Sequence, residues 1–176
     1  EPSRRQRQMC IRDRDNNNIP SSNTGPYCKA RQKLPTETLE SLVKLSGDSL
    51  SKSSDTRWKI YNREVKLIDG TTLTMADSEE NQARYPQHDA QKVGAGFPIM
   101  RLVAIMSLTT GGIMDYAVGA YKGKGTGEHA LLRQIKNSIH KGDIVMADRY
   151  FPCFFVMADL QSIGADGIFK AHSQRK

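Results

Sequence analysis

Two segments of the sequence share a layout that limits the fold strongly: a short apolar run that ends on an aspartate. Residues 144–147 (Ile-Val-Met-Ala) follow a Lys-Gly turn and lead into Asp148, and residues 65–68 lead into Asp69. The run at residues 144–147 is typical of a strand buried on both faces. A buried strand that delivers a carboxylate to its C-terminal end can place a metal ligand or catalytic group there. The alternative is that Asp148 is an ordinary polar residue at a strand exit.

The segment around Asp69 allows two interpretations. Residues 65–75 alternate as a strand should, with Val65 and Leu67 assigned to the buried side. Asp69-Gly70 between apolar residues is also a strong signal for a hairpin turn. The alternation does not decide between one continuous strand and a turn at this point.

The rest of the folded part predicts an α/β domain with a mixed sheet. Residues 99–108 and 113–120 are apolar and flank a Thr-Thr-Gly-Gly turn, so they should form an antiparallel pair. Helices are expected over 128–140 and 152–163, and a last strand over 166–171. The strand before Asp148 follows a helix, so a right-handed crossover can place it parallel to the strand of Asp69. The two aspartates would then meet at one edge.

The segments that connect these elements include two candidate sites for phosphate contact. Residues 76–98 are long and polar, contain Lys92, and are expected to form an ordered functional loop. Residues 121–127 form a glycine-rich basic loop with Lys122 and Lys124, for which a flexible connector is the alternative. His129 and His140, on the helix that follows, are expected to be surface residues rather than metal ligands.

The N-terminal part is predicted to be separate from this domain. Residues 1–26 have a composition typical of disorder, and residues 8–14 resemble a translated sequencing adaptor, which together with the missing initial Met suggests a fragment. Residues 27–46 predict one amphipathic helix stopped by Gly47, either the end of a DNA-contacting module or a packing helix. A linker over 46–57 then marks the boundary between 27–57, helix and linker, and 58–176, the main folded domain.

The charge and the cysteines limit the class of protein. The chain has 176 residues, a net charge of +7 and a pI of about 9.4, which points to a polyanion partner such as nucleic acid. Residues 1–33 carry +5 of this charge, so the argument is weaker for the folded part. Three widely spaced cysteines suit free thiols in a reducing compartment. Without a signal peptide or an apolar span, the protein is expected to be soluble and cytoplasmic.

Three blocks of sequence resemble the DDE transposases of bacterial insertion sequences, specifically the insertion-sequence-4 family. The first is Leu-Ile-Asp-Gly-Thr-Thr at 67–72, followed by residues 77–82 and Tyr-Pro-Gln at 85–87. The second runs from Gly-Phe-Pro at 96–98 to Thr-Gly-Glu at 126–128. The third is residues 142–151, which contain Asp148. Their order and spacing are more specific than any one block, and the resemblance covers residues 64–171.

This resemblance implies a ribonuclease-H-like core, a five-stranded mixed sheet with helices on both faces. It implies that Asp69 and Asp148 are the first two catalytic acids and that they hold Mg²⁺ or Mn²⁺, with Asp69 bridging two ions. Arg149 and Tyr150, with Lys92, Lys122 and Lys124, become candidate DNA contacts. The partners implied are the terminal inverted repeats and target DNA, and a second copy of the full-length protein in a homodimeric synaptic complex.

The third acid of the family lies in a Tyr-Arg-Glu-Lys block, which this sequence lacks. We therefore expect the chain to be a catalytic-domain fragment that does not cleave DNA by itself. The alternatives are an inactive or domesticated remnant that binds DNA without catalysis, and a ribonuclease-H-like nuclease, which the blocks outside the two acids do not support.

Overall fold

The computed structural model describes residues 23–170, which belong to two compact units, one ending at Leu39 and one beginning at Glu40. Most of the segment predicted to be disordered, including the adaptor-like residues 8–14, lies outside the described residues. The first two residues of helix α2 (Gly25–Gln32) are the last two residues of that segment. No helix within 23–170 is long and apolar enough to cross a lipid bilayer.

The single helix predicted over 27–46 is wrong, because the structure has two helices there. Helix α2 ends at Gln32, and α3 (Thr36–Ser53) begins after Pro35. Proline disfavours helical backbone at the residue before it, which here is Leu34, so the helix breaks at this point. Proline is readily tolerated just before or within the first turn of a new helix.

Helix α3 also continues through Gly47, so the linker predicted at 46–57 is wrong as far as Ser53. Gly47 is buried against the neighbouring strand, and a Cβ atom there would lie 2.4 Å from the Ile113 carbonyl oxygen. The glycine therefore allows a close approach within the second unit rather than ending the helix. After α3 the chain makes a short 3-10 helix, η1 (Thr56–Trp58), and enters the sheet.

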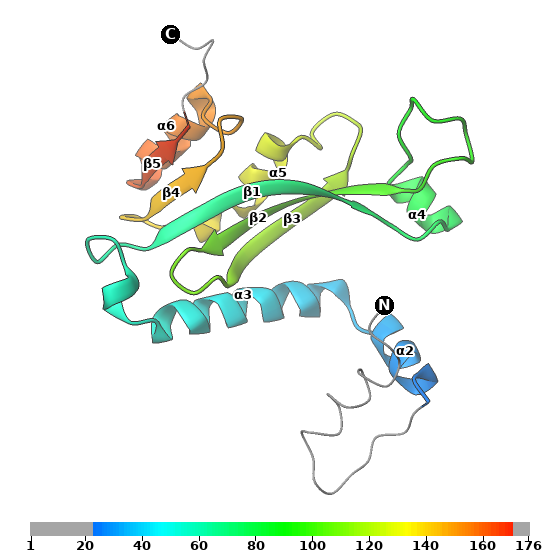
Figure 1. Ribbon diagram of the computed structural model, residues 1–176, viewed down its shortest axis with the longest axis horizontal. Helices are drawn as coiled ribbons and strands as arrows, with labels where there is room; N and C mark the ends of the chain where they lie inside the picture. The colour runs from blue at the N-terminus through cyan, green and yellow to red at the C-terminus, as the bar shows by residue number, and fades with distance from the viewer. Residues whose placement is uncertain (1–22, 171–176) are drawn as a thin grey trace, which may run out of the picture. The chain divides into compact units, whose positions relative to one another are not determined.

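The sheet has five strands in the order β3-β2-β1-β4-β5 (Figure 1). Their bounds are β1 Val65–Thr74, β2 Ile99–Ser107, β3 Ile113–Ala120, β4 Ile144–Ala147 and β5 Asp166–Phe169. Strands β1, β2 and β3 are antiparallel neighbours, whereas β4 is parallel to both β1 and β5. The predicted mixed sheet and the parallel pairing of the two aspartate-bearing strands are confirmed.

Strand β1 runs without interruption through Asp69 and Gly70, so the hairpin interpretation of this dipeptide is wrong. Nine consecutive residues of β1, from Lys66 to Thr74, pair with β2. The long segment after β1 is ordered, as predicted, and contains the short helix α4 (Glu79–Arg84), whose N-cap is the Ser78 hydroxyl.

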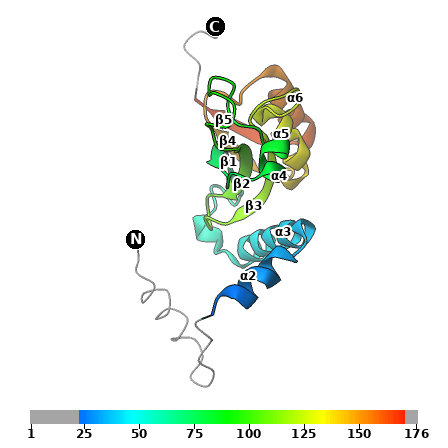
Figure 2. The ribbon, with the colours of Figure 1, turned by 90° about the vertical axis from the view of Figure 1, so that its right-hand side faces the viewer.

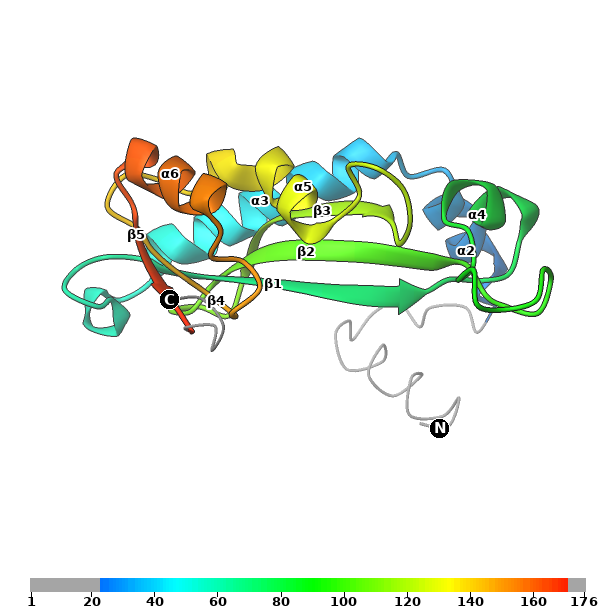
Figure 3. The ribbon, with the colours of Figure 1, turned by 90° about the horizontal axis from the view of Figure 1, so that it is seen from above.

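Helices α5 (Glu128–Ile135) and α6 (Phe154–Ile163) cover one face of the sheet, as Figures 2 and 3 show from two directions. Helix α5 packs on β2 and β3, and α6 packs beside β5. The core between these layers is apolar, with Ile68, Val103 and Val145 from the strands and Leu131 and Leu160 from the helices. Burial of this surface is the main force that holds the sheet and the helices together.

The opposite face of the sheet has no helix over it within residues 40–170 (Figure 3), so the second helical layer implied by the resemblance is not found in this part of the chain. Leu67 belongs to this face, because its neighbours Lys66 and Ile68 contact the helical side. The assignment of Leu67 to the buried side was therefore wrong. Leu67 pairs with Met106 and Met146, and Met146 pairs with Ile168, which forms an apolar row across four strands.

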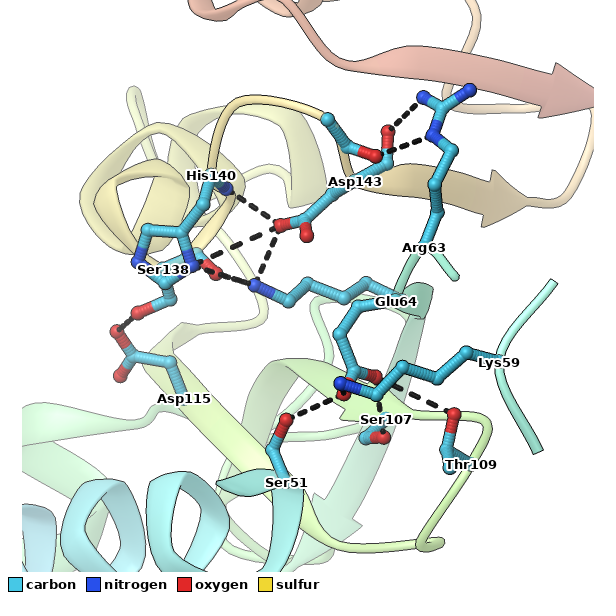
Figure 4. Close-up of polar contacts among 12 residues, drawn as sticks. Ser51, Lys59, Arg63, Glu64, Ser107, Thr109, Asp115, Ser138, His140 and Asp143 are labelled. Carbon is cyan, nitrogen blue, oxygen red and sulfur yellow. Dashed lines mark hydrogen bonds and ion pairs between the residues drawn. The ribbon is translucent and has the colours of Figure 1, made fainter. Parts of the chain in front are cut away.

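Polar contacts fix the end of the sheet where β1 and β4 begin (Figure 4). The Arg63 guanidinium donates to the carbonyl oxygens of Gly142 and Asp143 and forms an ion pair with Asp166 at 2.6 Å. Lys66 is only 2% exposed, and its ammonium group lies 2.7 Å from the Asp143 carboxylate. These contacts link the starts of β1, β4 and β5 and so set their register.

Candidate catalytic site

Asp69 and Asp148 occupy equivalent positions on neighbouring parallel strands. The last paired residues of β1 and β4 are Ile68 and Ala147, and each aspartate follows its paired residue directly. Ile68 and Ala147 both contact the helix-covered core, so alternation directs Asp69, which continues β1, to the opposite face, while Asp148 begins the turn after β4. Both aspartates are exposed. The strand pairing thus brings the two aspartates to adjacent positions at the end of the parallel β1–β4 ladder.

Each carboxylate is held by a backbone N–H group close to it in sequence. Asp69 Oδ1 accepts a hydrogen bond from the Gly70 N–H at 2.8 Å, and Asp148 Oδ1 accepts one from the Tyr150 N–H at 2.9 Å. The second bond closes a small turn after β4. These bonds use one oxygen of each carboxylate and leave Oδ2 of each for other ligands.

The donor set suits a hard divalent cation. Carboxylate oxygens are the ligands preferred by Mg²⁺ and Mn²⁺, and Mg²⁺ is commonly held by one or two carboxylates together with water and substrate oxygens. Within residues 23–170 no cluster of three or more His, Cys, Asp or Glu side chains could hold a metal ion, so these two aspartates stand without a third such ligand there. The pair fits as part of a metal site.

A family model for the transposase DDE domain matches residues 61–170, which span all five strands and both aspartates. The chain belongs to the DDE transposase domain family. A search of curated proteins finds no match. DDE transposases generally depend on divalent metal ions and act on DNA, which agrees with the sequence expectation at this level.

Arg149 and Tyr150, predicted to contact DNA, lie in the turn directly after Asp148, and both are exposed. The Tyr150 ring does not project freely, because it stacks on the ring of His129 with centroids 4.8 Å apart and planes within 5°. Phe151, the next residue, is 1% exposed and anchors the turn in the core of this DDE domain. Arg149 remains a candidate for a phosphate contact, since its fork of N–H donors matches phosphate oxygens.

The three predicted DNA-contacting lysines lie in two segments that touch each other. Lys92 and Lys124 are exposed, while Lys122 forms an ion pair with Asp89. This pair offsets part of the Lys122 charge. Ile99 pairs with Thr74, and Ala120 pairs with Met100, so both segments begin near the far end of β1. Thr74 lies five positions after Asp69 on β1, which corresponds to roughly 17 Å.

Two residues that support loops of the domain were missed or undervalued by sequence reasoning. Arg101 stacks on the Tyr121 ring at 4.9 Å and donates to the Thr126 carbonyl oxygen at 3.0 Å, so it supports the glycine-rich loop of the DDE domain. His129 was expected to be a surface residue but contacts the turn that carries Asp148. For Arg101, the position of a charged residue inside an apolar strand is a weak sequence signal that it has a structural role. No sequence signal identifies the contact of His129.

Proposed function

We propose that this chain is part of a transposase of the insertion-sequence-4 family, which cleaves DNA at the ends of a mobile element and joins them to target DNA. The observation that carries the proposal is that Asp69 and Asp148 each directly follow the last residue pair of two parallel strands, within a matched transposase domain. The three sequence blocks of that family support the narrower assignment.

In this proposal Asp69 and Asp148 bind Mg²⁺ or Mn²⁺ through carboxylate oxygens. Bound divalent ions supply activation of water or a 3′-hydroxyl as nucleophile and stabilisation of charge at the phosphate. The Tyr150 N–H group orients the Asp148 carboxylate through its 2.9 Å hydrogen bond. Arg149 holds a DNA phosphate beside the acids, and Lys92, Lys122 and Lys124 bind the backbone further along the duplex.

The 176-residue chain alone is expected not to cleave DNA at a measurable rate. Two carboxylates hold one divalent ion weakly, and the described residues offer no cluster of three ligands. The resemblance implies that a glutamate in a Tyr-Arg-Glu-Lys block supplies the third ligand, and that two copies of the full-length protein act together on the element ends.

The test is a cleavage and strand-transfer assay with the continuous reading frame that contains these residues. If a Tyr-Arg-Glu-Lys block follows downstream, the longer protein should cut and join element-end DNA in Mg²⁺, and Asp69→Asn or Asp148→Asn should abolish both steps. Full activity of either variant would refute the site. A stop codon before such a block, together with DNA binding but no cleavage, would favour the non-catalytic remnant.

A further inference from the structure

The first turn of α5 contacts both aspartate-bearing segments, although it belongs to neither. Glu128 lies against Gly70, the residue after Asp69: a methyl group on Gly70 would lie 2.7 Å from Glu128 Cδ. His129 lies against Tyr150, two residues after Asp148. Two consecutive residues of one helix thus reach the two strands whose relative position defines the proposed metal site.

The contact with the Asp148 side is the more specific of the two. His129 Nε2 lies 3.2 Å from the Tyr150 carbonyl oxygen, and a carbonyl can only accept, so the hydrogen bond requires a proton on Nε2. The same imidazole ring stacks on the Tyr150 ring and meets Phe151 edge-on at 5.9 Å. Tyr150 in turn donates its N–H to Asp148 Oδ1. A continuous series of contacts therefore runs from His129 through Tyr150 to the carboxylate.

The contact on the Asp69 side depends on a missing side chain. By strand alternation, Asp69 faces the uncovered side of the sheet, so a side chain at position 70 would face the helix-covered side. The Glu128 side chain occupies the space that a Cβ atom of residue 70 would need. A carboxylate in the first turn of α5 is stabilised by the positive end of the helix. Glu128 therefore stays beside β1 at the level of Asp69.

We propose that His129 is a positioning residue for the metal site, acting through Tyr150 on the Asp148 carboxylate, with Glu128 and Gly70 setting the distance of α5 from β1. The inference rests on the proposed function of Asp69 and Asp148. His129 does not touch the metal or the DNA; it fixes the turn whose N–H group orients one ligand. This gives the stacked pair a role beyond packing.

The test measures Mn²⁺ binding to the 176-residue chain by electron paramagnetic resonance of free Mn²⁺, and hydrogen exchange of the Tyr150 amide by NMR. The Mn²⁺ binding that is lost in Asp69→Asn and in Asp148→Asn is the binding that depends on the proposed site. His129→Ala should weaken that binding roughly three- to tenfold, less than the loss typical of residues that bond a ligand directly. It should also speed exchange of the Tyr150 amide, because the turn opens more often.

Three further variants separate positioning from general stability. His129→Gln retains an amide N–H donor and should recover much of the affinity, whereas His129→Phe retains only the ring. His88→Ala is the matched control, because His88 also packs on a tyrosine, Tyr121, at 5.5 Å but contacts neither aspartate-bearing turn. It should leave Mn²⁺ binding unchanged even if it lowers the melting temperature by as much as His129→Ala.

The outcomes distinguish this inference from the proposed function. If Asp69→Asn and Asp148→Asn leave Mn²⁺ binding unchanged, the metal site itself is refuted, and the Tyr150 amide alone decides whether His129 holds the turn. If both aspartate variants abolish binding but His129→Ala changes neither the affinity nor the amide exchange, the positioning role is refuted. Equal losses in His129→Ala and His88→Ala would also refute it.

Discussion

At the scale of single residues, the two aspartates should matter for metal binding and hardly at all for stability. Both are exposed, and each directly follows the last residue pair of the β1–β4 ladder. We expect Asp69→Asn and Asp148→Asn to abolish Mn²⁺ binding while changing the free energy of unfolding by less than about 0.5 kcal/mol. Urea denaturation and Mn²⁺ titration check this, with the exposed Asp48→Asn on α3 as a control for the loss of one charge.

Lys66 is the opposite case, a charged residue that matters for the fold. It is 2% exposed and lies 2.7 Å from Asp143, which is 6% exposed. Lys66→Met would leave the buried Asp143 carboxylate without its ammonium partner, so we expect a loss of about 3–5 kcal/mol in the free energy of unfolding. Adding Asp143→Asn should restore part of it, because the amide oxygen can still accept from the His140 N–H. A double variant no more stable than Lys66→Met would contradict this account.

At the scale of elements, Glu64 joins α3 to the β2–β3 hairpin. Its carboxylate accepts hydrogen bonds from Ser51 at 2.6 Å and from Ser107 and Thr109 at 3.4 Å, and it lies 3.2 Å from the Lys59 ammonium (Figure 4). Burial acts to raise the pKa of Glu64, but the hydrogen bonds from Ser51 and Lys59 outweigh it, so the pKa is lowered. The folded state therefore favours the ionised form.

This lowered pKa gives a pH-dependent prediction. The stabilisation by Glu64 is fully present above its ordinary pKa of 4.5 and is lost as the pH falls through the lower pKa of the folded state. Glu64→Gln should cost roughly 1–2 kcal/mol at pH 7. The difference between the two proteins should shrink in urea titrations below pH 4.5. A difference that stays constant down to pH 3 would show that the charge is not involved.

Helix α3 offers a second test at this scale. Alanine normally stabilises a helix interior by about 1 kcal/mol relative to glycine. At Gly47 the added methyl would meet the backbone oxygen of Ile113, which cannot move aside without shifting β3. Gly47→Ala should therefore destabilise the second unit by roughly 1–3 kcal/mol. Ser49→Ala, at an exposed position of the same helix, is the control, and thermal unfolding of both proteins decides.

The elements that the sequence predicted well are those with a local signal. The strand around Ile68 alternates, and those around Val103 and Val145 are largely apolar runs next to turns. Their pairing follows from short connections and crossover handedness. The errors arose where distant contacts decide. Gly47 resembles a helix stop but fits a close approach to β3, and Leu67 resembles a core residue but lies on the face away from the helices. His129 acquires its partner only when α5 docks beside the turn after β4.

At the scale of the whole molecule, the positive charge is concentrated near the N-terminus. Residues 1–33 carry a net charge of +5, whereas residues 40–176 carry +3. We expect the chain to bind duplex DNA weakly, with affinity that falls steeply between 50 and 200 mM salt, and removal of residues 1–22 should make that slope shallower. Fluorescence anisotropy with a labelled duplex measures both. An unchanged slope would assign the contacts to residues 23–176.

The parallel pairing of β1 with β4 also has a consequence for how the protein comes into being. Asp69 and Asp148 are separated by 79 positions in the chain, and the antiparallel β1–β2–β3 meander lies between them. Contacts between such distant residues form late in folding, after the local hairpins, because a long loop must close first. A nascent chain on the ribosome therefore carries its first acid long before the second can join it. The two carboxylates of the proposed metal site therefore cannot come together until α5 and β4 have emerged and docked.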